Sequence, residues 1–155
     1  MTFETSTIGS AATKDLGRRL ARHLKGGEVV ELVSDLGGGK TTLAKGLVAG
    51  LGYDGDVPSP TFTVSRVYPV RDGLEVHHFD FYRLGTHDIV SDQLTEVMGD
   101  PKAITVIEWA EHGAGQLPDG RISIDIVPGK QEDERLIKLS GPEKLIDELK
   151  HDIND

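Results

Sequence analysis

Apolar residues recur along the chain with two spacings, one typical of helices and the other typical of strands. Leu16, Leu20 and Leu24 repeat at helical spacing with arginines between them, which predicts an amphipathic helix. Short apolar or alternating runs predict strands, and glycines after several segments mark where those segments end. The predicted helices are Ser10–Lys25, Thr41–Leu51, His87–Met98 and Pro142–Ile153, and the predicted strands are Val29–Val33, Thr61–Val70, Leu74–Asp80, Ala103–Trp109, Arg121–Val127 and Leu136–Ser140.

The order of these elements predicts an α/β fold. Helices and strands alternate in the first half of the chain, whereas strands follow one another later, and Arg71-Asp72-Gly73 predicts the turn of a β-hairpin. This order favours a mixed sheet flanked by helices, with an antiparallel portion. The length of 155 residues predicts a single domain over 1–155, with 152–155 as a frayed tail.

Composition narrows the class of protein. Hydrophobic residues make up 37% of the chain, enough for one core, yet no run approaches the roughly 20 apolar residues of a membrane-spanning helix. The N-terminus lacks the basic segment and apolar run of a secretory signal peptide, and the chain has no cysteine. We therefore expect a cytoplasmic protein without disulfides or cysteine-bound zinc. The formal net charge of −9 repels phosphate backbones, so nucleic-acid binding without a basic partner is not expected.

The most specific motif is a glycine-rich loop between a predicted strand and a predicted helix. Glycines let successive backbone N–H groups converge on phosphate oxygens, and a helix that begins there directs its positive end at the anion. Lys40 is placed to reach the β- and γ-phosphates, and the hydroxyl of Thr41 to bind Mg²⁺. Ser34 stands where the usual pattern has its first glycine. The candidate nucleotide-binding residues of this loop are Asp35, Leu36, Gly37, Gly38, Gly39, Lys40, Thr41 and Thr42.

Two acidic residues, Asp80 and Glu108, end predicted strands. Phosphoryl chemistry needs a carboxylate for the metal and a group that orients the attacking nucleophile, and α/β sheets bind ligands at the carboxyl ends of their strands. Glu108 follows the more apolar strand and is the candidate metal carboxylate, whereas Asp80 is the candidate base or water-orienting residue. Trp109, the only tryptophan, is expected near the nucleotide or at a partner surface. His77 and His78 are neighbours on a strand and should point to opposite faces, so they do not predict a metal site.

Four segments together resemble one known family. In order and spacing they are similar to the motifs of the TsaE (YjeE) family, bacterial ATPases required to form threonylcarbamoyladenosine in tRNA. The loop differs from the family's Gly-Asp-Leu-Gly-Ala-Gly-Lys-Thr at Ser34 and Gly38, and the resemblance extends from about Ser10 to Arg135. The four segments are Ser34 to Thr42, Ser59-Pro60-Thr61-Phe62-Thr63, His78-Phe79-Asp80-Phe81-Tyr82-Arg83-Leu84 and Ile107-Glu108-Trp109.

The resemblance implies a P-loop NTPase fold that binds ATP or ADP with Mg²⁺. Carried over by position, Thr41 and Glu108 hold the metal, and Lys40 holds the phosphates. Thr61 is then a switch-like contact to the nucleotide, and Asp80 supports hydrolysis. The remaining implied nucleotide contacts are Ser10 and Ala11 near the base, Trp109, and Arg135 near the nucleotide.

The resemblance also implies partner proteins. The family binds a heterodimer of TsaD-like and TsaB-like proteins, and its ATPase cycle allows repeated rounds of modification. Contact with tRNA is then indirect, through the complex, which agrees with the net charge of −9.

Three other functions compete with this one. A GTPase with an Asn-Lys-x-Asp base-recognition loop is excluded, because the only asparagine is Asn154 in the tail. A P-loop kinase of a small metabolite normally needs an arginine-bearing lid, and the sequence has no obvious one. A nucleotide-gated binding module that hydrolyses nothing remains the alternative from a different class.

Overall fold

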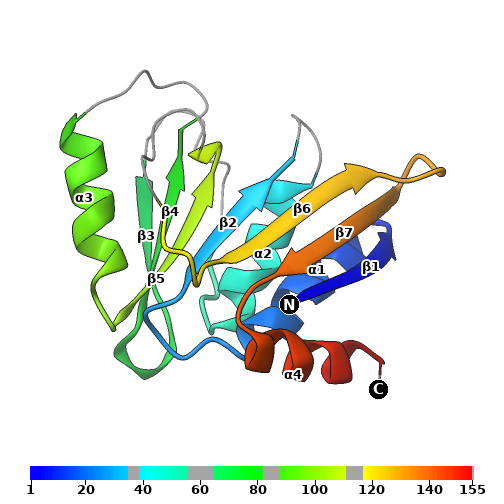
Figure 1. The fold of residues 1–155 in the computed structure, drawn as a ribbon, viewed down its shortest axis with the longest axis horizontal. Coiled ribbons are helices and arrows are strands. Elements are labelled where there is room, and N and C mark those ends of the chain that lie inside the picture. Colours follow the sequence, from blue (N-terminus) through cyan, green and yellow to red (C-terminus); the bar gives the residue numbers. More distant parts are fainter. Residues whose placement is uncertain (35–38, 56–64, 82–87, 111–116, 155) are drawn as a thin grey trace.

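The computed structural model describes residues 1–34, 39–55, 65–81, 88–110 and 117–154. Strands and helices alternate through much of the chain, as Figure 1 shows, and a short 3-10 turn, Arg71–Gly73, joins β3 to β4. The strands are β1 (Thr2–Ile8), β2 (Val29–Val33), β3 (Ser65–Pro69), β4 (Glu75–Asp80), β5 (Ala103–Glu108), β6 (Ile122–Pro128) and β7 (Glu134–Ser140), and the helices are α1 (Ser10–Ala21), α2 (Lys40–Gly50), α3 (Asp88–Met98) and α4 (Glu143–Asn154).

The strands of the described residues form one seven-stranded mixed sheet in the order β1-β7-β6-β2-β5-β4-β3. Its centre is parallel, because β2 pairs with both β5 and β6, and β4 pairs with β5, all in the same direction. Both edges are antiparallel, since β3 forms a hairpin with β4, and β7 pairs with β6 and β1. The predicted α/β fold with a mixed sheet is confirmed.

Helices cover the two faces of the sheet unequally. Alternate residues of β2 divide between two apolar clusters, because successive side chains of a strand point to opposite faces. Val30 and Leu32 pack in the larger cluster with α1, α2 and α4, whereas Val29 packs in the smaller one with Leu94 of α3. In Figure 1, α3 stands beside β3, β4 and β5, at the opposite end of the sheet from β1.

Glycines let α1 and α2 pack unusually close together. A Cβ atom at Gly46 would lie 1.9 Å from the carbonyl oxygen of Lys14, and one at Gly17 would lie 2.4 Å from that of Leu43. No larger residue fits these positions without moving backbone. Further along the same crossing, Gly50 lies against Arg18, so the two helices run in the same general direction. They therefore begin at the same end of the sheet.

Strand β1 is absent from the sequence prediction. Its inward positions include Phe3 and Thr7, and a strand whose inner face is largely threonine does not show the apolar alternation on which the prediction depends. Its place comes instead from pairing with β7, from Thr2 opposite Ser140 to Ile8 opposite Glu134.

One predicted helix end is wrong, because the first helix ends at Ala21 rather than at Lys25. The last helix, predicted to end at Ile153, continues to Asn154, so residues 152–154 form the last turn of α4. Asp152 holds this turn against α1, because its carboxylate accepts hydrogen bonds from Arg19 at 3.2 Å and His23 at 3.0 Å.

No helix in the described part of the chain combines the length and the apolar character needed to cross a membrane.

Candidate functional site

A cavity of about 610 Å³ opens at the end of the sheet where α1 and α2 begin. The two walls come from opposite ends of the chain, because the β1–β7 pairing brings the start of α1 next to the turn that precedes β7. The Gly9 amide donates to the Asp133 carbonyl across this junction at 2.9 Å. The cavity is lined by Gly9, Ser10, Thr13, Gly39, Thr42, Glu132, Asp133 and Arg135.

The start of α2 has the features of an anion-binding helix end. Gly39, its N-cap residue, has φ 104°, in the left-handed region that glycine adopts without strain. Among the described residues no side chain caps this helix end, and its first turn contains no acidic residue. The backbone N–H groups and the positive end of the helix dipole therefore face a site without a competing carboxylate on the helix itself. Arg135 lies close by, with its Nε 4.0 Å from where a Cβ atom of Gly39 would stand.

The side chain of Lys40 is buried and contacts two other parts of the chain. Its Nζ donates to the Ser34 carbonyl at 3.0 Å and lies 3.7 Å from the centre of the Trp109 ring. Trp109 has φ 58°, a left-handed conformation that is costly for a bulky residue. Trp109 follows Glu108 directly, and its strained backbone directs the indole toward Lys40.

The two candidate acids are side by side. Asp80 and Glu108 are register partners at the carboxyl ends of the parallel strands β4 and β5. The Glu108 side chain is only 4% exposed, and its Oε2 lies 2.5 Å from Nε2 of His78, which is itself 1% exposed. His77 points to the opposite face and pairs with Glu75 at 3.1 Å, as expected for neighbours on a strand. The described residues contain no group of three or more side chains suited to hold a metal ion by themselves.

The structure brings most of the described candidate residues together. Ser10, Gly39, Thr42 and Arg135 share the cavity. Ala11 is the exposed second residue of α1 and does not line the cavity, while Thr41 is half-buried in the first turn of α2. The candidate residues that lie outside the described residues are Asp35, Leu36, Gly37, Gly38 and Thr61.

Sequence reasoning missed Thr13, Glu132 and Asp133 as cavity residues, and His78 as the partner of Glu108. The positions of Glu132 and Asp133 depend on the unpredicted pairing of β1 with β7, whereas Thr13 lies on the predicted helix α1, one turn after Ser10. His78 shares the strand face of Asp80, but its contact with Glu108 also depends on the register of β4 and β5.

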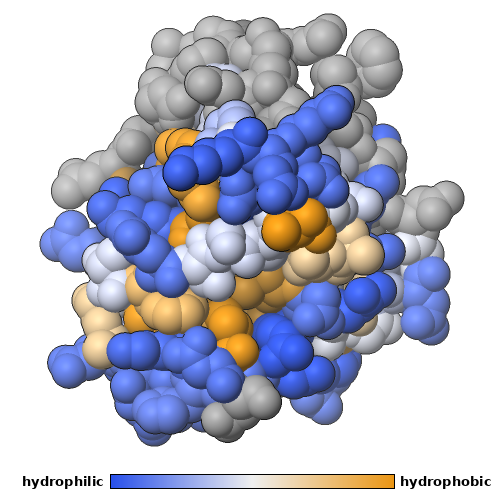
Figure 2. All heavy atoms as spheres, turned by 90° about the vertical axis from the view of Figure 1, so that its right-hand side faces the viewer, coloured by the Kyte–Doolittle hydropathy of each residue, from blue (hydrophilic) through white to orange (hydrophobic). Residues whose placement is uncertain are grey.

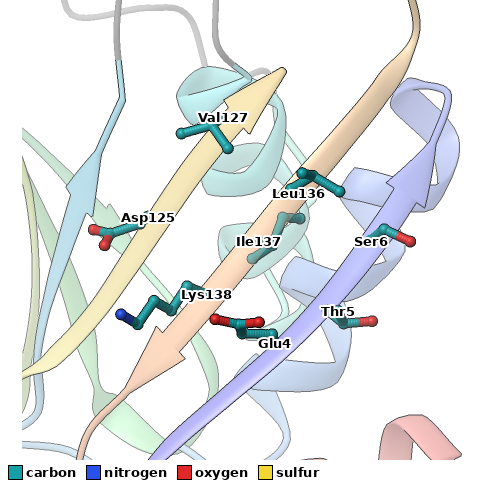
Figure 3. A pocket seen from close by; sticks show the side chains of 8 residues that line it. All are labelled: Glu4, Thr5, Ser6, Asp125, Val127, Leu136, Ile137 and Lys138. Carbon is teal, nitrogen blue, oxygen red and sulfur yellow. The ribbon is translucent and has the colours of Figure 1, made fainter. Parts of the chain in front are cut away.

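A second hollow, of about 580 Å³, lies elsewhere on the molecule, across the outer face of β6, β7 and β1. Figure 3 shows Lys138 at its centre, with Asp125 and Glu4 on the neighbouring strands and Val127 beside Leu136. Figure 2, a view from the right-hand side of Figure 1, shows apolar surface among hydrophilic side chains on this side of the molecule. The hollow contains none of the candidate residues, and nothing in the described structure shows what covers it.

Comparisons with known proteins identify relatives of this chain. The family model for the threonylcarbamoyl adenosine biosynthesis protein TsaE matches residues 8–137. The chain is 41% identical over 134 residues to the tRNA threonylcarbamoyladenosine biosynthesis protein TsaE of Streptomyces coelicolor, a match that covers 83% of this chain and 89% of that protein. It is 36% identical over 154 residues to the corresponding protein of Bacillus subtilis, with 94% and 93% covered.

A solved structure is similar over nearly the whole fold. The crystal structure of Bacillus subtilis YdiB superposes with a TM-score of 0.75 at 31% sequence identity, and the match covers 98% of this chain and 97% of that one. Sequence motifs, fold and relatives lead to one conclusion: the chain belongs to the TsaE family.

Proposed function

We propose that this protein binds ATP with Mg²⁺ and hydrolyses it slowly, in support of partner proteins that form threonylcarbamoyladenosine in tRNA. Membership of the TsaE family gives the general role in threonylcarbamoyladenosine biosynthesis. The observation that carries the ATPase proposal is the position of Lys40. Lys40 stands at the start of α2, whose first turn has no acidic residue. Its ammonium contacts Trp109, the residue that follows the buried Glu108.

The start of α2 supports phosphate binding. Helix N–H groups and the Lys40 ammonium supply donors and positive charge, and a lysine contacts phosphate as a point charge. The cavity beside Gly39 extends this site toward Ser10 and Arg135, with room for the base and sugar of a nucleotide. A nucleotide with its phosphates at α2 and its base between Ser10 and Arg135 would span both ends of the site.

The side chains fit a magnesium ion bound together with a nucleotide. Mg²⁺ usually takes one or two protein oxygens, with phosphate oxygens and water as its other ligands, so a cage of several carboxylates is not required. The Thr41 hydroxyl and the Glu108 carboxylate form such a donor set. The buried Glu108 carboxylate has one hydrogen-bond donor among the described residues, and a bound cation would stabilise such a carboxylate further. The bound metal would neutralise charge that develops on the phosphate oxygens.

Asp80 is placed to support the hydrolytic step. It is half-buried and lies directly beside Glu108 in the register of β4 and β5. In the proposed site, Glu108 holds the metal side and Asp80 orients the attacking water or accepts its proton.

The partners proposed are a TsaD-like and a TsaB-like protein. The net charge of −9 disfavours direct binding of tRNA, so the complex, rather than this chain, would carry the tRNA. Nucleotide turnover would then control how this chain engages that complex.

Phosphate release by the purified chain tests the proposal. With ATP and Mg²⁺ we expect slow release that rises when a TsaD–TsaB complex is added and disappears in Lys40→Ala. Absence of turnover under both conditions would favour a nucleotide-gated binding module. Transfer of phosphate to a small acceptor would favour a kinase.

A further inference from the structure

The side chain of His78 has a specific place between the apolar core and the candidate site. It points to the sheet face that carries Val76 in the larger apolar cluster, and it is 1% exposed. In the β4–β5 register His78 is opposite Val106, and Asp80 is opposite Glu108. His78 and Glu108 are therefore diagonal neighbours on one face, a separation that long side chains can bridge.

The contact between the two side chains fixes the direction of the Glu108 carboxylate. An ionised carboxylate only accepts hydrogen bonds, so the short contact of 2.5 Å is a donation from Nε2–H of His78 to Oε2. Among the described residues, His78 is the only side chain that hydrogen-bonds this carboxylate. Oε2 of Glu108 is therefore occupied by His78 of β4, and Oε1 remains available to another ligand.

Packing alone does not favour a histidine at this position. Its other ring nitrogen, Nδ1, is buried and has no hydrogen-bond partner among the described residues. A buried polar atom without a partner lowers the free energy of unfolding. An aliphatic side chain would fill the same space among Val76 and its apolar neighbours without that penalty, so the gain from histidine lies in the donor at Nε2.

We infer that His78 is the positioning residue for the metal-binding carboxylate. By holding Oε2, it keeps Glu108 in the one orientation from which Oε1 can reach a cation bound with the nucleotide. This inference rests on the proposed function, because it assigns the metal to Glu108. Residues that orient a metal ligand typically change metal affinity by about 10- to 100-fold when removed.

Metal affinity measured without turnover tests the inference. The ADP-loaded protein is titrated with Mn²⁺, followed by electron paramagnetic resonance, and ADP binding is measured separately in EDTA. His78→Leu removes the donor and fills the space, and His78→Asn places its amide nitrogen only as far out as Nδ1. Both should lower Mn²⁺ affinity about tenfold or more while ADP binding in EDTA stays unchanged. Whichever of the two folds with a cooperative melt is sufficient for the measurement.

Two further variants separate positioning from a structural effect. His78→Gln reaches about as far as Nε2 and should restore Mn²⁺ affinity, and the matched control His77→Asn, on the opposite face, should leave it unchanged. In a Glu108→Gln background, His78→Leu should cause no further loss, because it acts through Glu108.

Several results would overturn the inference. Wild-type Mn²⁺ affinity in every folded variant of the pair His78→Leu and His78→Asn would do so. A His78→Gln variant no better than these variants, or an equal loss in the Glu108→Gln background, would also overturn it. A wild-type protein that binds neither ADP nor Mn²⁺ would instead overturn the proposed function itself, and with it the role of His78.

Discussion

The ammonium group of Lys40 lies 3.7 Å from the centre of the Trp109 indole ring. A cation over an aromatic face gains about 0.5–2 kcal/mol, depending on how far the pair is removed from water. The same ammonium donates to the Ser34 carbonyl, and both contacts help to hold it in place. Phosphate oxygens that reach Lys40 would compete with both contacts and change the surroundings of the indole.

Trp109 should therefore report nucleotide binding. As the only tryptophan, it accounts for all tryptophan emission of the chain. We expect its emission to change when ADP or ATP is added with Mg²⁺, to saturate at the calorimetric dissociation constant, and to stay constant in Lys40→Ala. Constant emission while calorimetry records binding would mean that the ligand does not reach this lysine.

Replacing Lys40 should weaken nucleotide binding. Lys40→Ala removes a charge-assisted contact to phosphate, and we expect at least a tenfold loss of ATP affinity, about 1.4 kcal/mol, by isothermal titration. Lys45, exposed on the same helix, provides the matched control, and Lys45→Ala should bind as the wild type does. Equal affinities in all three proteins would show that the helix end does not hold phosphate.

Substitutions of the two neighbouring acids should impair different steps, metal-dependent binding in one case and turnover in the other. Glu108→Gln should weaken the Mg²⁺ dependence of nucleotide binding, because a metal carboxylate is lost. Asp80→Ala should leave binding nearly unchanged while turnover falls. Calorimetry with and without Mg²⁺, together with a phosphate-release assay, separates the two effects. If the variants exchange behaviours, the assigned roles are reversed, and normal turnover in both would remove these acids from the mechanism.

The crossing of α1 and α2 should be sensitive to one methyl group. In Gly46→Ala the new Cβ would meet the Lys14 carbonyl oxygen at 1.9 Å, so the helices must separate. We expect a loss of about 1–3 kcal/mol in the free energy of unfolding, measured with urea. Gly99→Ala is the control, because its Cβ would meet its nearest atom at an ordinary 3.6 Å. Similar stabilities for the two variants would mean that the helices can part at little cost.

Much of the fold could be predicted because its central elements have clear apolar patterns. The strands β2 and β5, for example, are nearly continuous apolar runs, as expected for strands buried on both faces. Strand β1 could not be predicted in this way, since its inner face includes the polar Thr7, and its position depends on a strand near the other end of the chain.

The same division applies to the candidate site. The neighbouring positions of Asp80 and Glu108 at one edge of the sheet could be predicted because each residue stands at the end of a recognisable strand. The hydrogen bond between His78 and Glu108 could not, because it depends on the relative register of β4 and β5. The lining by Glu132 and Asp133 depends on the unpredicted β1–β7 pair.

That pair also has a consequence for the order in which the protein acquires its binding site during synthesis. A chain emerging from the ribosome presents β1 well before its pairing partner, because the residue opposite Ile8 is Glu134. Until β7 emerges, β1 has no neighbouring strand, and the cavity lacks the wall that includes Arg135. Because such distant strands pair late, a chain whose β7 has not yet emerged would carry the start of α2 without the complete cavity.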